Sequence, residues 1–376
     1  MRYIAPNVLK DLEKKMVFIG GPRQVGKTTL AKAILSERFP KGLHFNWDFD
    51  EDRQDILKKR WASDNTLLVF DELHKFPRWK SWIKGLYDVA HETHSFLVTG
   101  SARLDLYRRG GDSLMGRYHY WRLHPFTLDE FPKGLTPKEA FRRLMTVGGF
   151  PEPFLDPDER DARRWRRERF DRVLREDVRD LESVRNIRLL GLLLDLLRQR
   201  VGGLVAVSNL AGDLHVSPKT VNSWIEVLER MYLVFAVRPY TRSLPRAVVK
   251  PAKIYFFDNA DVIGAEGARF ENLVAASLLK RLHFLEDRDG YRYELRYIRD
   301  KEGREVDFAV LKEGEVEELV EAKYSDDGIS KSLLYYAERL KPERATQITA
   351  TVKRPYDQNR VKVTDPFSYF GGFFDK

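Results

Sequence analysis

The stretch over residues 16–30, MVFIGGPRQVGKTTL, constrains the fold of this chain more than any other stretch. A short apolar run leads into a glycine-rich turn, in which Gly21 and Gly26 enclose four residues and a Lys-Thr pair follows. This spacing is G-x-x-x-x-G-K-[ST], the pattern of a loop whose backbone N–H groups surround phosphate oxygens. The pattern predicts a buried strand, a phosphate-binding loop and then a helix.

Each residue type in this loop has a physical task. The glycines permit positive φ angles and a close approach of the backbone to an anion. Lys27 is predicted to reach the β and γ phosphates, and the hydroxyl of Thr28 to bind Mg²⁺. The following helix directs the positive end of its dipole at the anion. The predicted nucleotide-binding residues are Gly21, Pro22, Arg23, Gln24, Val25, Gly26, Lys27, Thr28, Thr29 and Ser101.

A second acidic element follows in TLLVFDELHKF. The apolar run Leu67–Phe70 predicts a strand buried in a parallel sheet, and Asp71 and Glu72 come at its carboxyl end, where such sheets bind ligands. We predict that Asp71 holds Mg²⁺ and that Glu72 polarises the water that attacks the γ phosphate. The sequence therefore predicts binding and hydrolysis of ATP with Mg²⁺ as cofactor.

Two further roles are expected near the γ phosphate. The segment SFLVTGSAR predicts another buried strand, after which Thr99 or Ser101 is placed to sense that phosphate. Arg117 is the candidate for the arginine that stabilises transition-state charge, in the same subunit or in a neighbour. Any such arginine can instead be a solvated side chain or contact a phosphate backbone. Three other arginines compete for the role: Arg103, Arg108 and Arg109.

Length and charge set outer bounds. The chain has 376 residues, too many for one compact core, which predicts two to four domains. A net charge of +9 favours an anionic partner but is modest for this length, and the alternative is that it serves solubility. The sequence contains no cysteine, which excludes disulfides, Cys-ligated zinc and thiol nucleophiles. No run resembles a secretory signal or a membrane span, so we expect a cytoplasmic protein.

Residues 137–200 are predicted to be helical and are rich in arginine. Acidic residues are interleaved with the basic ones, which favours a helix with its own ion pairs over a nucleic-acid stripe. Residues 205–231 then predict a helix-turn-helix: a short helix over Asn209–Leu214, a turn, and a longer helix. Ser217 is the expected N-cap of the longer helix, and Pro218 suits its first position.

Two strands, MYLVFAVRPY and VKPAKIYFFD, are expected to form a wing after this unit. Basic residues along them predict contact with nucleic acid, although winged helices also serve as protein-interaction modules. These basic residues are Arg238, Arg242, Arg246, Lys250 and Lys253.

The last hundred residues predict an amphipathic helix, ARFENLVAASLLKRL, with Glu271 in its first turn, followed by a run of strands. Alternation places Glu321 and Lys323 on one face of a strand, with Asp307 on the strand before it. We expect these four side chains to converge, two carboxylates binding Mg²⁺ and the lysine orienting a water. The alternative is an exposed strand face of alternating charge.

The order of these motifs resembles an archaeal and bacterial family of AAA-type ATPases with a C-terminal domain of unknown function. The motifs are GPRQVGKTT, VFDE, VTGS, SLMGR, GGFPEP, KIYFFD, FENLV, EVDF and VEAK. The resemblance implies an AAA-type core with Lys27, Thr28, Asp71 and Glu72, and a C-terminal domain similar to PD-(D/E)XK nucleases. It also implies a homo-oligomer, because a neighbour's arginine commonly completes AAA-type sites. Val306 precedes Asp307 where the nuclease signature usually has proline.

The expected fold class is α/β, in four parts. An AAA-type P-loop NTPase core over 1–134 is followed by a helical lid over 135–204, a winged helix over 205–258 and a restriction-endonuclease-like α/β domain over 259–376. The expected function is a Mg²⁺-dependent ATPase that acts on nucleic acid, DNA rather than RNA. The alternative is an ATP-gated switch that binds a protein partner and has an inactive nuclease fold.

Overall fold

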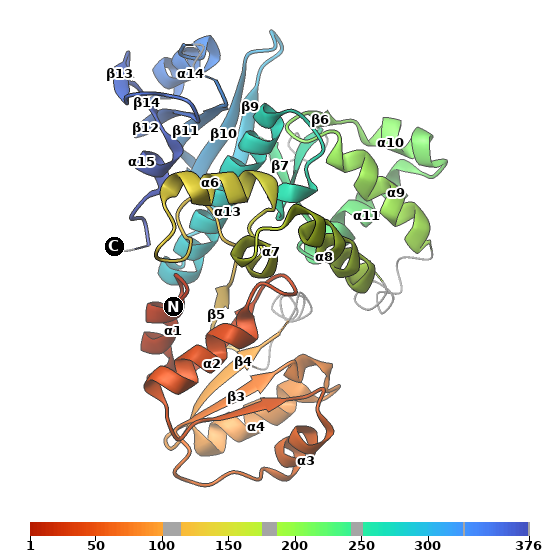
Figure 1. Ribbon diagram of the computed structural model, residues 1–376, viewed down its shortest axis with the longest axis vertical. Helices are drawn as coiled ribbons and strands as arrows, with labels where there is room; N and C mark the ends of the chain where they lie inside the picture. The colour runs from red at the N-terminus through yellow and green to blue at the C-terminus, as the bar shows by residue number, and fades with distance from the viewer. Residues whose placement is uncertain (101–113, 175–185, 242–250, 326–327, 375–376) are drawn as a thin grey trace. The chain divides into compact units, whose positions relative to one another are not determined.

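A computed structural model describes residues 1–100, 114–174, 186–241, 251–325 and 328–374. Its contacts divide the chain into two compact units, Met1–His124 and Pro125–Lys376. Figure 1 labels many of the helices and strands of both units, and each unit is described by itself.

The first unit contains a five-stranded sheet in the order β2-β3-β4-β1-β5, and every neighbouring pair is parallel. Both β1 and β3 are buried along their whole length, as expected for apolar strands covered on both faces. The carboxyl ends of these strands meet at one edge of the sheet. The strands are β1 (Met16–Gly20), β2 (Leu43–Asn46), β3 (Leu67–Asp71), β4 (Ser95–Thr99) and β5 (Tyr118–Arg122).

The helices of the first unit are α1 (Ala5–Leu12), α2 (Lys27–Arg38), α3 (Asp50–Lys58) and α4 (Trp79–Ala90), with a 3-10 turn η1 (Leu73–Lys75). A core of aromatic and aliphatic side chains, including Phe70, Phe96 and Trp79, packs between the sheet and α4. Burial of each such side chain stabilises the fold by roughly 1.5–3 kcal/mol. This core holds the strand ends in place, and the predicted strand, loop and helix over residues 16–30 are confirmed.

The second unit begins with helices. They are α6 (Pro137–Thr146), α7 (Pro151–Leu155), α8 (Glu159–Arg172), α9 (Ile187–Arg198), α10 (Val207–Leu214) and α11 (Pro218–Arg230). The predicted cap of α11 is confirmed, because Ser217 Oγ accepts a hydrogen bond of 3.1 Å from the N–H of Thr220. On α8, Arg163 pairs with Glu159 and Arg164 with Asp161, so the helix carries ion pairs of its own, as expected.

A nine-stranded sheet completes the second unit, in the order β13-β14-β12-β11-β10-β9-β7-β8-β6. Its strands are β6 (Leu204–Val205), β7 (Val234–Pro239), β8 (Ala252–Phe256), β9 (Tyr293–Arg299), β10 (Glu305–Lys312), β11 (Glu315–Lys323), β12 (Arg344–Thr349), β13 (Tyr356–Gln358) and β14 (Val361–Thr364). The two strands expected to form a wing, β7 and β8, are antiparallel, and β7 also pairs in parallel with β9. The wing strands therefore continue into the C-terminal sheet, and the four domain boundaries stay a prediction.

The remaining helical elements are η3 (Asn259–Asp261), α13 (Glu266–Asp289), α14 (Lys331–Leu340) and α15 (Pro366–Phe370). The placement of Glu271 in the first turn of α13 is wrong, because the helix begins five residues earlier, at Glu266. Helix α13 therefore includes Gly267 as its second residue, because each residue added to a helix that has formed gains one hydrogen bond. In the parts of the chain that the structure describes, no helix has the length and apolar character to cross a bilayer.

Candidate functional site

The loop over residues 21–26 connects β1 to α2 and depends on glycine at both ends. Gly26 is the N-cap of α2 with φ 95°, and Gly21 has φ 136°. A Cβ atom on Gly21 would lie 2.3 Å from the carbonyl oxygen of Leu123. No larger residue fits at this position, so the loop's shape requires glycine.

Lys27 is the first residue of α2, and its side chain folds back over the loop. Its Nζ donates hydrogen bonds to the carbonyl oxygens of Gly21, at 3.1 Å, and Pro22, at 2.6 Å. The residue is only 7% exposed. The structure thus brings the predicted lysine and the predicted loop together.

Thr28 and Asp71 meet where the loop helix passes the end of β3. Thr28 Oγ1 donates a hydrogen bond of 2.5 Å to Asp71 Oδ2, and Thr99 Oγ1 donates to Oδ1. Burial raises the pKa of Asp71, but nearby His44 and the bonds from Thr28 and Thr99 lower it more, so this pKa lies below its usual value. The carboxylate is therefore ionised at neutral pH, beside a hydroxyl oxygen. Oxygen ligands of this kind suit Mg²⁺, so these residues fit the expected ion.

Glu72 follows Asp71 in a left-handed conformation with φ 58°, and its N–H donates a hydrogen bond of 2.9 Å to the carbonyl of Thr99. Strained backbone of this type is concentrated at functional sites. Burial raises the pKa of Glu72, while Lys75, with Nζ 3.3 Å from Oε2, and Lys27 oppose this effect. A carboxylate with a raised pKa suits a general base.

Arg117 is not brought to the loop of its own chain. It forms an ion pair with Asp88, with Nε 2.6 Å from Oδ1. It directly precedes β5, whose first residue pairs with Met16 at the start of β1, whereas the loop follows the end of β1. Parallel strands therefore place Arg117 at the opposite edge of the sheet, which corrects the expectation for the same subunit. The competing Arg103, Arg108 and Arg109, and Ser101, lie outside the described residues.

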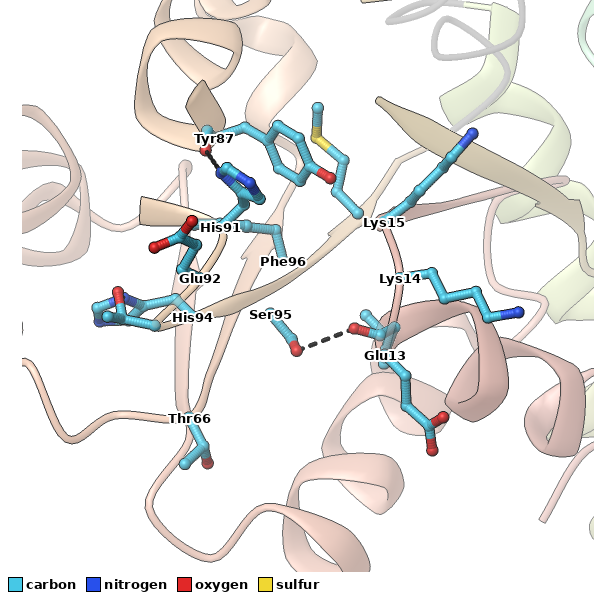
Figure 2. Close-up of a pocket in the computed structure, with 13 residues that line it drawn as sticks. Glu13, Lys14, Lys15, Thr66, Tyr87, His91, Glu92, His94, Ser95 and Phe96 are labelled. Atoms are coloured by element: carbon cyan, nitrogen blue, oxygen red, sulfur yellow. Dashed lines mark hydrogen bonds between the residues drawn. The ribbon is translucent and has the colours of Figure 1, made fainter. Parts of the chain in front are cut away.

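A pocket of about 200 Å³ lies at that opposite edge, near the starts of β1 and β4 (Figure 2). Ser95 Oγ donates a hydrogen bond of 3.0 Å to the carbonyl of Leu12, and His91 Nδ1 lies 3.0 Å from the carbonyl of Tyr87. These polar groups of the pocket wall bond to the chain itself. The pocket is separate from the phosphate loop and does not belong to the nucleotide site.

The four residues of the expected C-terminal site do converge. The N–H of Asp307 donates to Glu321 Oε2 at 3.3 Å, and the N–H of Ala322 donates to Asp307 Oδ2 at 3.1 Å. Lys323 Nζ lies 3.0 Å from Glu321 Oε1. A register shift between Val306 and Ala309 places Asp307 in a bulge of β10, and bulges re-aim side chains near functional sites.

Lys253 of β8, one of the basic residues predicted to line the wing, joins Glu271 to this group. Its Nζ lies 3.3 Å from Glu271 Oε1, 2.7 Å from Glu305 Oε1 and 3.2 Å from Asp307 Oδ1. At 1% exposure it cannot contact nucleic acid, so its place among the basic wing residues is wrong. Alternation along the strand could have indicated this burial, because it places Lys253 on the same face as Tyr255. Tyr255 also donates a hydrogen bond to Glu271.

Burial, with the charge of Asp307, raises the pKa of Glu321 to about 7, although Lys323 opposes the rise. Burial and Asp307 also raise the pKa of Glu271, against the effect of Lys253. Within the described ranges, no three His, Cys, Asp or Glu side chains are arranged to hold a metal ion. Mg²⁺ can be held by only one or two carboxylates with water, so the ion expected on Asp307 and Glu321 stays a prediction.

The basic wing is only partly described. Arg238 NH2 lies 3.5 Å from Glu229 Oε2, so this charge is already paired. Arg242, Arg246 and Lys250 lie outside the described residues. On α11, Lys219 and Asn222 are exposed.

A parallel sheet, a glycine loop at the end of β1, and Lys27 and Thr28 at the start of the next helix define a P-loop nucleotide-binding domain. Residues 13–132 match the family described as "AAA domain", so the first unit carries an AAA-type P-loop ATPase domain. Residues 138–264 match "Domain of unknown function (DUF8612)", and residues 266–365 match "Domain of unknown function (DUF4143)".

Relatives of this chain are found in archaea and bacteria. "Uncharacterized protein MJ1544" of Methanocaldococcus jannaschii is 23% identical over 95% of this chain and 86% of its own length. "Uncharacterized protein Rv2008c" of Mycobacterium tuberculosis is 25% identical over 65% of this chain and 54% of its own length. In the second case the chain spans only about half of the relative.

Two solved structures are similar at low identity. A RuvB variant of Thermotoga maritima is 17% identical, with 62% of this chain and 88% of that chain covered and a TM-score of 0.33. The Aeropyrum pernix ORC1 protein in complex with DNA is 15% identical, with 74% and 91% covered and a TM-score of 0.29. Both TM-scores are below 0.5, so these similarities carry no weight for the partners of this chain.

Proposed function

We propose that the first unit binds ATP with Mg²⁺ and hydrolyses it. The observation that carries this proposal is the 2.5 Å contact between Thr28 Oγ1 and Asp71 Oδ2, which sets two oxygen ligands side by side next to the phosphate loop. Mg²⁺ bound there would neutralise charge on the phosphates. The family match of residues 13–132 supports the same activity.

The other residues of the site have separate roles in this proposal. Backbone N–H groups of residues 21–26 and the start of α2 bind phosphate oxygens, and Lys27 places its ammonium group against them. Glu72 accepts a proton from the attacking water, a contribution of roughly 10²–10⁴-fold to the rate. Its raised pKa supports this role.

Two substitutions separate binding from chemistry. Lys27→Ala should weaken ATP binding in calorimetric titrations, and Lys32→Ala, at an exposed position of the same helix, is the matched control. Unchanged affinity in Lys27→Ala would mean that the site is misplaced. Glu72→Gln should bind ATP normally but lose turnover by roughly 10²–10⁴-fold, because an amide cannot accept the proton. Exposed Glu37→Gln is its control, and normal turnover in Glu72→Gln would refute the assignment.

We further propose that the ATPase acts on nucleic acid, DNA rather than RNA, through a winged helix made of α10, α11, β7 and β8. Exposed Lys219 and Asn222 near the start of α11 support this, as does the net charge of +9. DNA should stimulate ATP turnover, and its affinity should fall steeply with salt. Lys219→Ala should reduce both effects more than exposed Lys138→Ala does. Absence of stimulation and of salt-dependent binding would favour the ATP-gated protein switch.

We also propose a homo-oligomer in which a neighbour's arginine completes the site, with Arg117 as one candidate. Light scattering with and without ATP measures the mass of the assembly. A monomer with full activity in ATP would refute this proposal.

A further inference from the structure

Lys253 lies inside a cluster of carboxylates that come from two other elements of the second unit. Glu271 is on α13, and Glu305 and Asp307 are on β10. The ammonium nitrogen lies 2.7–3.3 Å from one oxygen of each. Tyr255, two residues along β8, donates a hydrogen bond of 2.6 Å to Glu271 Oε1. The strand thus supplies both a cation and a donor to the same carboxylates.

The cluster is closely packed around this cation. The side chain of Lys253 is 1% exposed, and a buried ammonium is tolerated only where charges of opposite sign surround it. Burial lowers the pKa of Lys253, but Asp307, Glu271 and Glu305 raise it more, so the lysine stays charged. Gly202 lies against Glu271, where a Cβ atom would come within 2.7 Å of Oε2.

The carboxylates of Asp307 and Glu321, which were expected to bind Mg²⁺, already make contacts within the chain. Asp307 faces Lys253 with Oδ1 and accepts the N–H of Ala322 with Oδ2. Glu321 holds Lys323 with Oε1 and accepts the N–H of Asp307 with Oε2. A Mg²⁺ ion requires oxygens at about 2.0–2.1 Å. An ion on Oδ1 of Asp307 would therefore have to displace the ammonium group of Lys253, which lies 3.2 Å from that oxygen.

We propose that the ammonium group of Lys253 occupies the position of a divalent metal in this carboxylate cluster, so that the cluster is built on an internal cation and binds no metal. The C-terminal sheet then provides no metal for phosphodiester cleavage. The role of Lys253 and the absence of a metal in this cluster do not depend on the proposed ATPase activity, whose site lies in the other unit.

Manganese binding tests the proposal directly. The full chain with Asp71→Asn, which removes a ligand from the first-unit site, is titrated with Mn²⁺, and free Mn²⁺ is followed by electron paramagnetic resonance. We expect no site that Mn²⁺ fills at a concentration of about 1 mM or below, which is roughly the weak end of protein affinities for divalent cations. Binding of one Mn²⁺ that disappears when Asp307→Asn is added would overturn the proposal.

The second arm removes the internal cation. Asp71→Asn with Lys253→Ala should gain one Mn²⁺ site, and adding Asp307→Asn should abolish it. A folded Lys253→Ala chain that gains no site would also overturn the proposal, because the vacated position would then not be a metal position. Circular dichroism establishes whether this variant folds. If it does not fold, the titration of the chain that retains Lys253 decides alone.

Discussion

Thr28 and Asp71 share a hydrogen bond of 2.5 Å although 43 positions separate them in the chain. The parallel sheet makes this contact possible, because β1 and β3 both end at the edge where the loop helix begins. Thr99, at the end of β4, donates to the other oxygen of the same carboxylate. Thr28 at the start of α2 and Thr99 at the end of β4 therefore orient the carboxylate of Asp71, at the end of β3.

Removal of the Thr28 hydroxyl should impair the use of Mg²⁺. We expect Thr28→Ala to raise the Mg²⁺ concentration for half-maximal ATP turnover by about tenfold or more, because one oxygen ligand is lost and Asp71 loses one of its hydrogen-bond donors. Thr28→Ser keeps the hydroxyl and should remain near the parent chain. Magnesium titrations of steady-state turnover measure this, and equal requirements in the two variants would contradict the assigned role.

Gly21→Ala should disrupt the phosphate loop. The added Cβ would lie 2.3 Å from the Leu123 carbonyl oxygen, and φ 136° is strained for alanine. We expect loss of ATP binding and a lower free energy of unfolding. Gly85→Ala on α4 is the matched control, because no atom lies within 4 Å of its added Cβ, and it should stabilise by about 0.5–1 kcal/mol. Calorimetry and urea unfolding measure both quantities. Normal ATP affinity in Gly21→Ala would show that the loop tolerates a side chain.

Lys280→Met should destabilise the second unit. Lys280 Nζ lies 2.7 Å from Glu130 Oε2 and 3.7 Å from Asp129 Oδ1, and the side chains of Lys280 and Asp129 are fully buried. Loss of the Lys280 ammonium group leaves the carboxylates of Asp129 and Glu130 without their buried cation, which lowers the free energy of unfolding by about 3–5 kcal/mol. Urea unfolding provides the value, and exposed Lys138→Met should change it by less than about 0.5 kcal/mol. A small effect at Lys280 would mean that Asp129 and Glu130 find other partners.

Glu321 should make stability depend on pH. Its pKa of about 7 in the folded chain exceeds the ordinary value of 4.5, so the folded chain binds more protons than the unfolded chain between these pH values. This difference in proton binding stabilises the folded chain fully below pH 4.5, and the stabilisation is lost as the pH rises through 7. In the parent chain, this loss amounts to about 3 kcal/mol.

Glu321→Gln removes that titration. Relative to the parent chain, its free energy of unfolding should improve by up to about 3 kcal/mol between pH 5 and pH 8. Urea unfolding at several pH values measures the difference. Exposed Glu338→Gln on α14, measured in the same way, is the matched control. A difference between Glu321→Gln and the parent chain that does not vary with pH would contradict the raised pKa.

Local sequence patterns were sufficient for the phosphate loop and for the cap of α11. The spacing of Gly21, Gly26 and Lys27 defines a strand, a turn and a helix within fifteen consecutive residues, and the geometry of a turn depends on the residues in it. Ser217 caps α11 through a bond to a residue three positions away. Such features need no knowledge of which distant segments pack together.

Strand order and depth of burial required the tertiary structure. Arg117 is the arginine predicted to stabilise transition-state charge, but the parallel pairing of β5 with β1 places it at the edge away from the loop. Lys253 was predicted as a basic residue of the wing. Its strand, β8, lies in the same sheet as β10, and Lys253 Nζ contacts Asp307, which is 54 positions later in the chain. Alternation along a strand predicts which side chains share a face, whereas only the packing of distant strands and helices decides what that face meets.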